Sequence, residues 1–523
     1  MEPRMCYDDA AWEKSEEVSD AWVLQFLEPD VLTPIGDYLV RHHSPEVPER
    51  FSILEKGAYN ISLRMTYENE RSAVIRFSQP GASMFPEEKV RNEVAIMRYI
   101  QDQTSIPVPF VLHWGTKKKS PLELSPFIIM EYIDHDTSMY DALNRPDCPR
   151  AECGTLDPDI NEAKLEALYG ELASILLQLS RLSLPRIGSL DQVDDFTWEL
   201  TRRPLSMPMN ELIRLGSLPQ SELPHTTFDT ASSYFEALAE LHITHLRNQR
   251  NDAIDSADDC RRKFVARYLF RKLAQDRRLT KHSASSDQGP FKLWCDDLRP
   301  ANVLVDEALK IVGVVDWEFT YAAPVEFSHA PPWWLLIEKP EYWPEGLDDW
   351  CRVYEQRLQT FLKAMKHRED EAIKQGQLEE SQRLSGPMRA SWESGDFWVS
   401  YSARNSFAFD AIYWKKLDGR FFGPTTCLVE DVWRQRLDLL DAEAKDDMEK
   451  LVARKLGEME TRVLAWDPDE YTLDNIDIAK RSKEQDEPMD NGTGEDDSED
   501  EVEAGVGEAR VDAMSNQLEG LAV

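Results

Sequence analysis

The stretch that decides the fold reads Leu293-Trp294-Cys295-Asp296-Asp297-Leu298-Arg299-Pro300-Ala301-Asn302-Val303-Leu304-Val305, and then Ile311-Val312-Gly313-Val314-Val315-Asp316-Trp317-Glu318. It predicts a polar loop that carries Asp297, two short strands joined by a turn over 306–310, and then Asp316. Each apolar run is short and rich in Val and Ile, which favours buried strands over helix. The hairpin therefore brings Asp297, Asn302 and Asp316 to one of its ends.

Three oxygen-bearing side chains in this arrangement match the needs of phosphoryl transfer. One carboxylate orients and deprotonates an acceptor hydroxyl, while the Asn carbonyl and the second carboxylate hold Mg²⁺ on the phosphates. A bare Asp-x4-Asn spacing is a weak signal, because it occurs about once by chance in a chain of this length. The alternative is a surface loop in which Asp297 makes a turn and Asn302 caps it. Leu298, Pro300 and the Asp-Trp-Glu ending favour the functional interpretation.

The segment resembles the aminoglycoside phosphotransferase and choline-kinase-like branch of the protein-kinase-like superfamily, above all its fungal members. The family's loop usually reads His-Gly-Asp-Leu-x-Pro-x-Asn, and Asp-Trp-Glu follows later. Here Cys295 stands in place of the His that braces the loop, and Asp296 in place of the Gly. The resemblance implies that Asp297 is the catalytic base and that Asn302 and Asp316 are metal ligands.

Composition limits the class of protein. The chain has 523 residues, 41% of them hydrophobic, and 15 Trp, which indicates a globular protein with two or three folding units. A net charge of −37 argues against nucleic acid as a partner, because neutralising phosphates needs an excess of Lys and Arg. An acidic surface could favour a cationic acceptor, but such charge more often serves solubility.

The cysteine content and the hydropathy of the sequence indicate a protein of a reducing compartment without a membrane span. Seven Cys without a Cys-x-x-Cys pair fit free thiols in a reducing environment, and the nearest pair, Cys148 and Cys153, is interpreted as structural. No run of eighteen apolar residues predicts a membrane span. The segment Met1 to Asp20 is acidic and shows neither a secretory nor a mitochondrial address. The default expectation is a cytoplasmic protein.

The first half of the chain resembles a small kinase lobe. A strand and turn are predicted over 51–63 and a second strand over 72–77, and the resemblance gives Gly57 to the phosphate-covering hairpin and Arg76 to the grip on the phosphates. Guanidinium can hold phosphate bidentately. The alternatives are an ordinary hairpin glycine and a solvated edge charge.

A helix is predicted from Pro86, and a strand over 127–133. The helix carries an apolar stripe, and the resemblance favours Glu93 beside it as the partner that fixes Arg76; the alternative is that Glu93 is solvated. The resemblance also implies that the backbone around Glu131 to Ile133 bonds the adenine edge.

The second half predicts a mainly helical lobe. An amphipathic helix spans about 160–184, the polar and Pro-rich stretch 201–228 is interpreted as a surface insertion, and helices follow near 232–246 and 260–273. His242 and His245 lack a third ligand, so they are interpreted as partly buried helix residues and not as a metal site. In relatives the acceptor binds on helices of the distal half, here about 350–440. Asp296 and Glu318 are hypothetical contacts for a cationic acceptor.

These observations predict an α+β, two-lobed protein-kinase-like fold with an antiparallel-sheet N-lobe and a mainly helical C-lobe. The expected parts are a helical lead-in, the N-lobe, the C-lobe with acceptor-binding helices, and a disordered acidic tail, at 1–49, 50–134, 135–470 and 482–523. The expected activity is ATP- and Mg²⁺-dependent transfer of the γ-phosphate to a hydroxyl of a small molecule, with no nucleic acid or membrane partner. The alternative is a weakly active or inactive pseudokinase that binds nucleotide or a protein as a scaffold. The acceptor and the oligomeric state stay open.

Overall fold

The computed structural model describes residues 5–42, 47–69, 71–146, 154–194, 197–279 and 287–476. The chain forms two compact units, each described by itself. The helical unit comprises 1–15, 87–111 and 133–469, and the sheet unit comprises 16–86, 112–132 and the segment from 470. The predicted acidic tail at 482–523 and the pair Cys148 and Cys153 lie outside the described residues.

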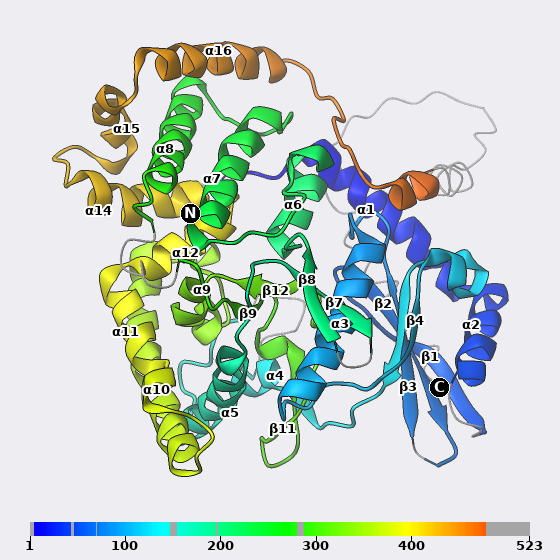
Figure 1. Ribbon diagram of the computed structural model, residues 1–523. Coiled ribbons are helices and arrows are strands. Elements are labelled where there is room, and N and C mark those ends of the chain that lie inside the picture. Colours follow the sequence, from blue (N-terminus) through cyan, green and yellow to red (C-terminus); the bar gives the residue numbers. More distant parts are fainter. Residues whose placement is uncertain are drawn as a thin grey trace, which may run out of the picture. The chain divides into compact units, whose positions relative to one another are not determined.

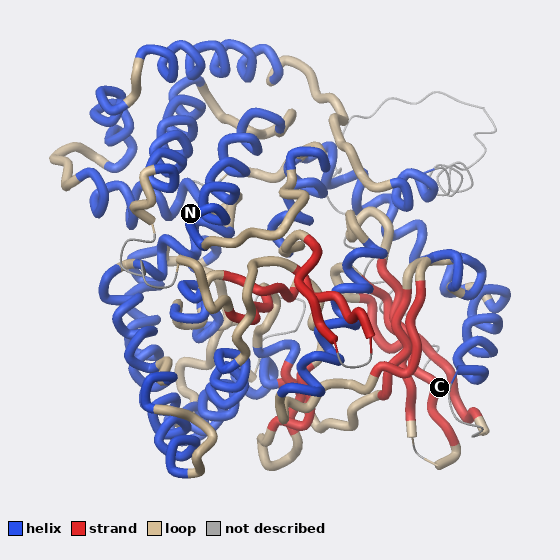
Figure 2. The backbone as a smooth tube through the Cα atoms, viewed as in Figure 1, coloured by secondary structure: helices blue, strands red, loops and turns tan. Residues whose placement is uncertain are grey.

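The sheet unit is built on five strands in the order β1-β2-β3-β5-β4. The pairs β1–β2, β2–β3 and β3–β5 are antiparallel, and strands dominate this part of the tube in Figure 2. Its elements are most of α1 (Asp9–Leu24), α2 (Pro29–His42), β1 (Pro48–Lys56), β2 (Asn60–Tyr67), β3 (Ser72–Ser78), β4 (Val111–Gly115) and β5 (Phe127–Glu131).

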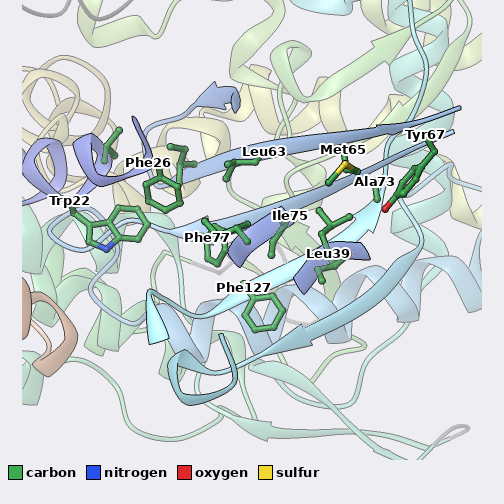
Figure 3. Close-up of a cluster of buried hydrophobic side chains, with 14 residues drawn as sticks. Trp22, Phe26, Leu39, Leu63, Met65, Tyr67, Ala73, Ile75, Phe77 and Phe127 are labelled. Carbon is green, nitrogen blue, oxygen red and sulfur yellow. The ribbon is translucent and has the colours of Figure 1, made fainter. Parts of the chain in front are cut away.

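The core of the sheet unit lies between the sheet and the helices α1 and α2. Every residue of β3 is buried, which its run of Ala, Val, Ile and Phe predicts for a central strand. Figure 3 shows the cluster: Trp22 and Phe26 from the N-terminal helices, Leu39 from α2, and residues of β2, β3 and β5 including Leu63, Met65, Ile75, Phe77 and Phe127.

Helices dominate the other unit (Figure 1). Its longer helices are α3 (Pro86–Gln103), α5 (Glu162–Arg181), α6 (Met207–Gly216), α7 (Ala231–Asn248), α8 (Ala257–Gln275), α10 (Leu347–Lys374), α11 (Ser385–Ser394), α12 (Asp396–Arg404) and α16 (Ala442–Glu458). The predicted amphipathic helix is confirmed as α5, whose N-cap residue Asn161 accepts hydrogen bonds from the amides of Ala163 and Lys164. Its buried stripe packs against α10.

Short strands in the helical unit carry the segment 293–318. The strands are β6 (Thr137–Ser138), β7 (Ser189–Asp194), β8 (Thr197–Arg202), β9 (Lys292–Cys295), β10 (Val303–Val305), β11 (Ile311–Val314) and β12 (Thr320–Ala323). The predicted hairpin is confirmed as β10 and β11, with Val303 opposite Val314. β12 pairs antiparallel with β9, so Thr320 lies opposite Cys295, the last residue of β9 before the loop that carries Asp297.

Two expectations from the sequence are wrong. The stretch 201–228 is not a surface insertion, because it contains α6, whose apolar face, including Met209, Leu212 and Ile213, is buried. Because prolines and polar residues lie on both sides of α6, the sequence pattern did not predict this short apolar stripe as a buried helix face. The strand predicted over 127–133 ends at Glu131, where the side chain emerges into solvent. The α+β class, with an antiparallel-sheet part and a mainly helical part, is confirmed.

Candidate active site

The loop between β9 and β10 meets the end of β11 through the backbone of Asn302. The amide of Val315 donates to the carbonyl oxygen of Asn302 at 2.9 Å, one residue before Asp316. Asn302 closes a single 3-10 turn, Pro300–Asn302, in which Pro at the first position costs no hydrogen bond. The hairpin register therefore fixes where the chain leaves β11 relative to the loop.

Asp297 and Asn302 contact each other directly. The Asn302 Nδ2 donates to the Asp297 carbonyl oxygen and to its Oδ2, both at 2.9 Å, and the Arg299 Nε donates to Oδ1 at 2.8 Å. Asp297 and Asn302 are 9% and 8% exposed. Burial raises the pKa of Asp297, and the Arg299 charge and the Asn302 hydrogen bond oppose that rise. The carboxylate is therefore held from two sides.

Asp316 has a left-handed backbone, with φ of 60°, and so has Phe319, with φ of 56°. Non-glycine residues in this region are strained and persist where their surroundings hold them in place. Trp317 lies between these two residues, and its Nε1 donates to the carbonyl of Val314 at 2.9 Å. The carbonyl of Phe319 accepts a long hydrogen bond, at 3.5 Å, from the backbone amide of Asp296. The segment from Asp316 to Phe319 is thus a tight, irregular turn and not an extension of β11.

Asp296, which replaces the glycine of the related loops, is a buried and neutralised carboxylate. The Arg404 Nη1 lies 3.5 Å from its Oδ1, the Trp294 Nε1 donates to it at 2.7 Å, and the Met207 amide donates at 3.2 Å. Burial raises the pKa of Asp296 while Arg404 lowers it. The guanidinium of Arg404 also lies 4.4 Å from the Trp294 ring centroid.

Cys295 occupies the bracing position with a buried thiol. Its Sγ donates weakly to the Glu318 carbonyl at 3.8 Å, which ties the loop to the turn that follows β11. Burial raises the pKa of this thiol well above its usual value, so it is a neutral packing group.

Glu318 forms a buried ion pair with Lys89 of α3. The Lys89 Nζ lies 2.5 Å from the Glu318 Oε2, and each side chain is 1% exposed. The hypothesis that Asp296 and Glu318 contact a cationic acceptor is wrong, because each is buried against a cation of the protein itself. Lys89 and Arg404 were not singled out in the sequence. The only local signal for Lys89 is its i, i+4 spacing to Glu93 beside the apolar stripe of α3.

The predicted nucleotide-binding residues are divided between the units. Gly57, Arg76 and Glu131 belong to the sheet unit, and Glu93 and Ile133 to the helical unit. Gly57 sits at the β1–β2 turn, where its amide donates to the carbonyl of Asn60 at 2.9 Å. The pairing of Arg76 with Glu93 stays a prediction.

The positions of these residues fit their local environment. Arg76 lies on the central strand β3 and is 8% exposed, and Glu131 ends β5 opposite Ala73. Glu93 is 2% exposed on α3, so it does not lie on a solvated face. The Ile133 side chain packs on Gly313, where a Cβ would stand 2.7 Å from its Cδ1.

A mostly apolar cavity of about 50 Å³ borders the loop between β9 and β10. It is lined by loop residues, by the segment 328–334 and by α11 and α12; Trp294, Leu298, Trp333, Met388, Phe397 and Tyr401 are among its walls. This volume holds only one or two water molecules. A larger polar hollow of about 780 Å³, between α3, α5 and α10, includes none of the predicted site residues.

The donor atoms at the loop fit a magnesium ion. The Asn302 Nδ2 donates to Asp297, which leaves the oxygen Oδ1 as the Asn302 atom for a cation. Asp316 is partly exposed and supplies a carboxylate. Mg²⁺ prefers oxygen ligands and often takes only one or two from the protein, with substrate phosphates and water completing its shell. Across the described ranges there is no group of three or more His, Cys, Asp and Glu that could hold a metal.

His242 and His245 on α7 are structural. Both are fully buried, more than expected; His242 Nδ1 lies 2.8 Å from the Ser406 Oγ, and His245 Nε2 lies 2.8 Å from the Gln249 Oε1. Desolvation lowers the pKa of each to about 3. They are neutral core residues at pH 7.

A small antiparallel-sheet unit, a mainly helical unit and an Asp–Asn–Asp set on a hairpin define a protein-kinase-like fold. The sequence profile of the phosphotransferase enzyme family matches residues 50–359, more than half of the chain, so the chain belongs to that family. The resemblance found in the sequence is thereby confirmed.

Curated relatives are fungal. The chain is 23% identical over 309 residues to altered inheritance of mitochondria protein 9, mitochondrial, of Clavispora lusitaniae, covering 53% of this chain and 49% of the relative. It is 24% identical over 294 residues to clavilactone A biosynthesis cluster protein Y of Ampulloclitocybe clavipes, covering 53% of this chain and 62% of the relative. The chain thus spans about half the length of the first relative.

The chain is also similar to solved structures of kinases and phosphotransferases. A thermostable aminoglycoside phosphotransferase in complex with AMP-PNP and hygromycin B is 14% identical, with a TM-score of 0.36, over 72% of this chain and 97% of that one. An ethanolamine kinase of Plasmodium vivax is 12% identical, with a TM-score of 0.35, over 79% and 86%. Among the described residues, no helix is long and apolar enough to cross a membrane.

Proposed function

We propose that the chain transfers the γ-phosphate of ATP, with Mg²⁺, to a hydroxyl group of a small molecule. Family membership supports phosphotransferase chemistry. The observation that carries the proposal is the contact between Asp297 and Asn302 at 2.9 Å, with the Asn302 backbone bonded one residue before Asp316. This set combines a base and oxygen ligands for a cation within one loop and hairpin.

The residues of the helical unit have distinct roles in this proposal. Asp297 accepts a hydrogen bond from the acceptor hydroxyl, orients it for in-line attack and takes its proton as the new O–P bond forms. The bond between the γ-phosphorus and the β–γ bridging oxygen breaks in the same step, and ADP leaves. Asn302 Oδ1 and the Asp316 carboxylate would hold Mg²⁺, which would supply charge neutralisation for the transferred phosphoryl group. Arg299, bonded to Asp297 Oδ1 and 44% exposed, keeps the base in orientation.

The sheet unit and the start of the helical unit supply the nucleotide contacts. Gly57 lets the β1–β2 turn approach the phosphates, and Arg76, fixed by Glu93, grips them. The backbone between Glu131 and Ile133 bonds the adenine edge.

A small-molecule acceptor is favoured over a protein. The sequence lacks an Ala-Pro-Glu tripeptide in the window after Asp316 where protein kinases carry it. One relative is named for a biosynthesis cluster of clavilactone A, which is consistent with a small-molecule context.

The test is Mg²⁺-dependent turnover of ATP by the purified chain, first as slow hydrolysis and then against a library of hydroxylated metabolites. Asp297→Ala should lower turnover by about 10²- to 10⁴-fold, the range of a lost base. Asp316→Ala should also lower turnover and should raise the Mg²⁺ concentration needed for half-maximal rate, because it removes a metal ligand. Asp306→Asn, in the exposed β10–β11 turn, is the matched control and should behave as the wild type.

A second candidate function is a nucleotide- or protein-binding scaffold. The observation that favours it is that both Asp297 carboxylate oxygens already accept hydrogen bonds, from Arg299 and Asn302, beside the unusual Cys295. Nucleotide binding without hydrolysis, and without transfer to any acceptor in the library, would favour the scaffold.

A further inference from the structure

Two acidic residues on the turn after β11 have opposite exposures. Asp316 is partly exposed, whereas Glu318 is 1% exposed and its Oε2 lies 2.5 Å from the Lys89 Nζ. The pair joins residues 229 positions apart, within the helical unit. Because a buried carboxylate without a cation is costly, this contact restricts where the turn can lie.

The turn needs such a restriction because its backbone is strained. Asp316 and Phe319 are both left-handed without being glycine, and Glu318 lies between them. The Glu318 carbonyl accepts from the Cys295 thiol, while its side chain extends to α3. Lys89 also lies 6.0 Å from the Phe319 ring centroid. One lysine thus contacts both residues that follow Trp317.

Other side chains also anchor α3 to its neighbours within the helical unit. Glu88 accepts two hydrogen bonds from Arg203, at 3.0 and 2.7 Å, and Asn92 donates to the Ser189 Oγ at 3.1 Å. These contacts reach β7 and the end of β8, not the turn after β11. Lys89, by contrast, forms an ion pair with Glu318 on the turn that carries Asp316.

We propose that Lys89 is a positioning residue that sets the orientation of the Asp316 carboxylate through Glu318, and so couples the position of α3 to metal affinity. The inference deepens the proposed function and rests on its assignment of Asp316 as a magnesium ligand. Residues that hold a metal ligand in orientation typically contribute about 10- to 100-fold to metal affinity. Lys89 acts without touching metal, nucleotide or acceptor.

The test measures Mn²⁺ binding with AMP-PNP by electron paramagnetic resonance, beside Mg²⁺-dependent turnover. Lys89→Met leaves Glu318 buried and unpaired, so the paired variant Lys89→Met/Glu318→Gln is included because it leaves no isolated charge. In the paired variant the Kd for Mn²⁺ should rise by about 10- to 100-fold. Lys89→Arg should recover part of that affinity.

The matched control is Glu88→Gln, which breaks the neighbouring ion pair on the same helix. It should lower the melting temperature but leave Mn²⁺ affinity unchanged, because Glu88 does not contact the turn. If the paired variant only lowers the melting temperature and keeps the wild-type Kd for Mn²⁺, the pair is structural and the inference is overturned.

The two proposals fail in different ways. If the wild type binds Mn²⁺ and AMP-PNP but transfers no phosphate, the proposed function fails while the Kd values still decide the role of Lys89. If Asp316→Ala binds Mn²⁺ as tightly as the wild type, the ligand assignment fails and the inference fails with it.

Discussion

The side-chain Nδ2 of Asn302 donates to two oxygens of Asp297, the carbonyl oxygen and Oδ2, each at 2.9 Å. The same residue accepts the Val315 amide through its backbone carbonyl. Asn302 therefore connects, through hydrogen bonds, the loop that carries the proposed base to the strand that leads to the proposed metal ligand.

The first prediction concerns these hydrogen bonds of Asn302. Asn302→Ala removes both hydrogen bonds to Asp297 and the oxygen offered to Mg²⁺, so turnover of ATP should fall by about 10²-fold or more, the cost of a misplaced reacting group. The concentration of Mg²⁺ at half-maximal rate should rise in the same variant. Steady-state kinetics over a range of Mg²⁺ measures both. An unchanged Mg²⁺ dependence would remove Asn302 from the metal site.

The second prediction concerns the buried pair of Asp296 and Arg404. Arg404→Met leaves a carboxylate that is 3% exposed without its cation, so the free energy of unfolding should fall by about 3–5 kcal/mol. Asp296→Asn/Arg404→Met removes both charges and should recover most of that loss. Urea unfolding followed by tryptophan fluorescence measures the difference.

The control for the buried pair of Asp296 and Arg404 is an ion pair at the protein surface. Arg352 pairs with Asp349 and its side chain is 63% exposed, so Arg352→Met should cost about 1 kcal/mol or less. Equal losses for the Arg352 and Arg404 variants would show that burial does not decide the strength of these pairs.

The third prediction concerns pH. The pKa of His242 and of His245 is lowered by desolvation to about 3 in the folded chain, against 6.5 for a free histidine. The unfolded chain therefore binds more protons between these values, so stability is fully present above pH 6.5 and falls as pH drops toward 3. The slope is at most about 1.4 kcal/mol per pH unit for each histidine.

Denaturant unfolding between neutral and mildly acidic pH tests the slope. His242→Asn/His245→Asn should lower stability at neutral pH and flatten its decline below pH 6.5. His225→Asn, at an exposed position, should leave the decline unchanged. A decline as steep in the double variant as in the wild type would place the acid sensitivity elsewhere.

The fourth prediction concerns the charge of the acceptor. Asp296 and Glu318, the two carboxylates considered as contacts for a cationic acceptor, are neutralised by Arg404 and Lys89. Neutral hydroxyl compounds should therefore be phosphorylated at least as well as amines of similar size, and KM should change little with salt. A cationic acceptor whose KM rises steeply with salt would contradict this expectation.

The sequence by itself determined the elements that depend on neighbours along the chain. The β10–β11 hairpin follows from two short runs of Val and Ile around a turn, and a hairpin necessarily returns the chain to where it began. The apolar spacing of α5 likewise fixed its buried face before any partner was known. Local patterns suffice here, because strand pairing across a turn and helix amphipathicity are short-range properties.

Only the tertiary structure decided which charges are neutralised and which helices are buried. Asp296 meets Arg404 across 108 positions, and Lys89 meets Glu318 across 229, separations that no local pattern encodes. α6 was missed because its stripe is short and flanked by prolines, and its burial depends on the helices around it. Desolvation is the physical reason: whether a carboxylate is a ligand, a base or half of a buried ion pair is set by the side chains that exclude water from it, and folding brings these from distant parts of the chain.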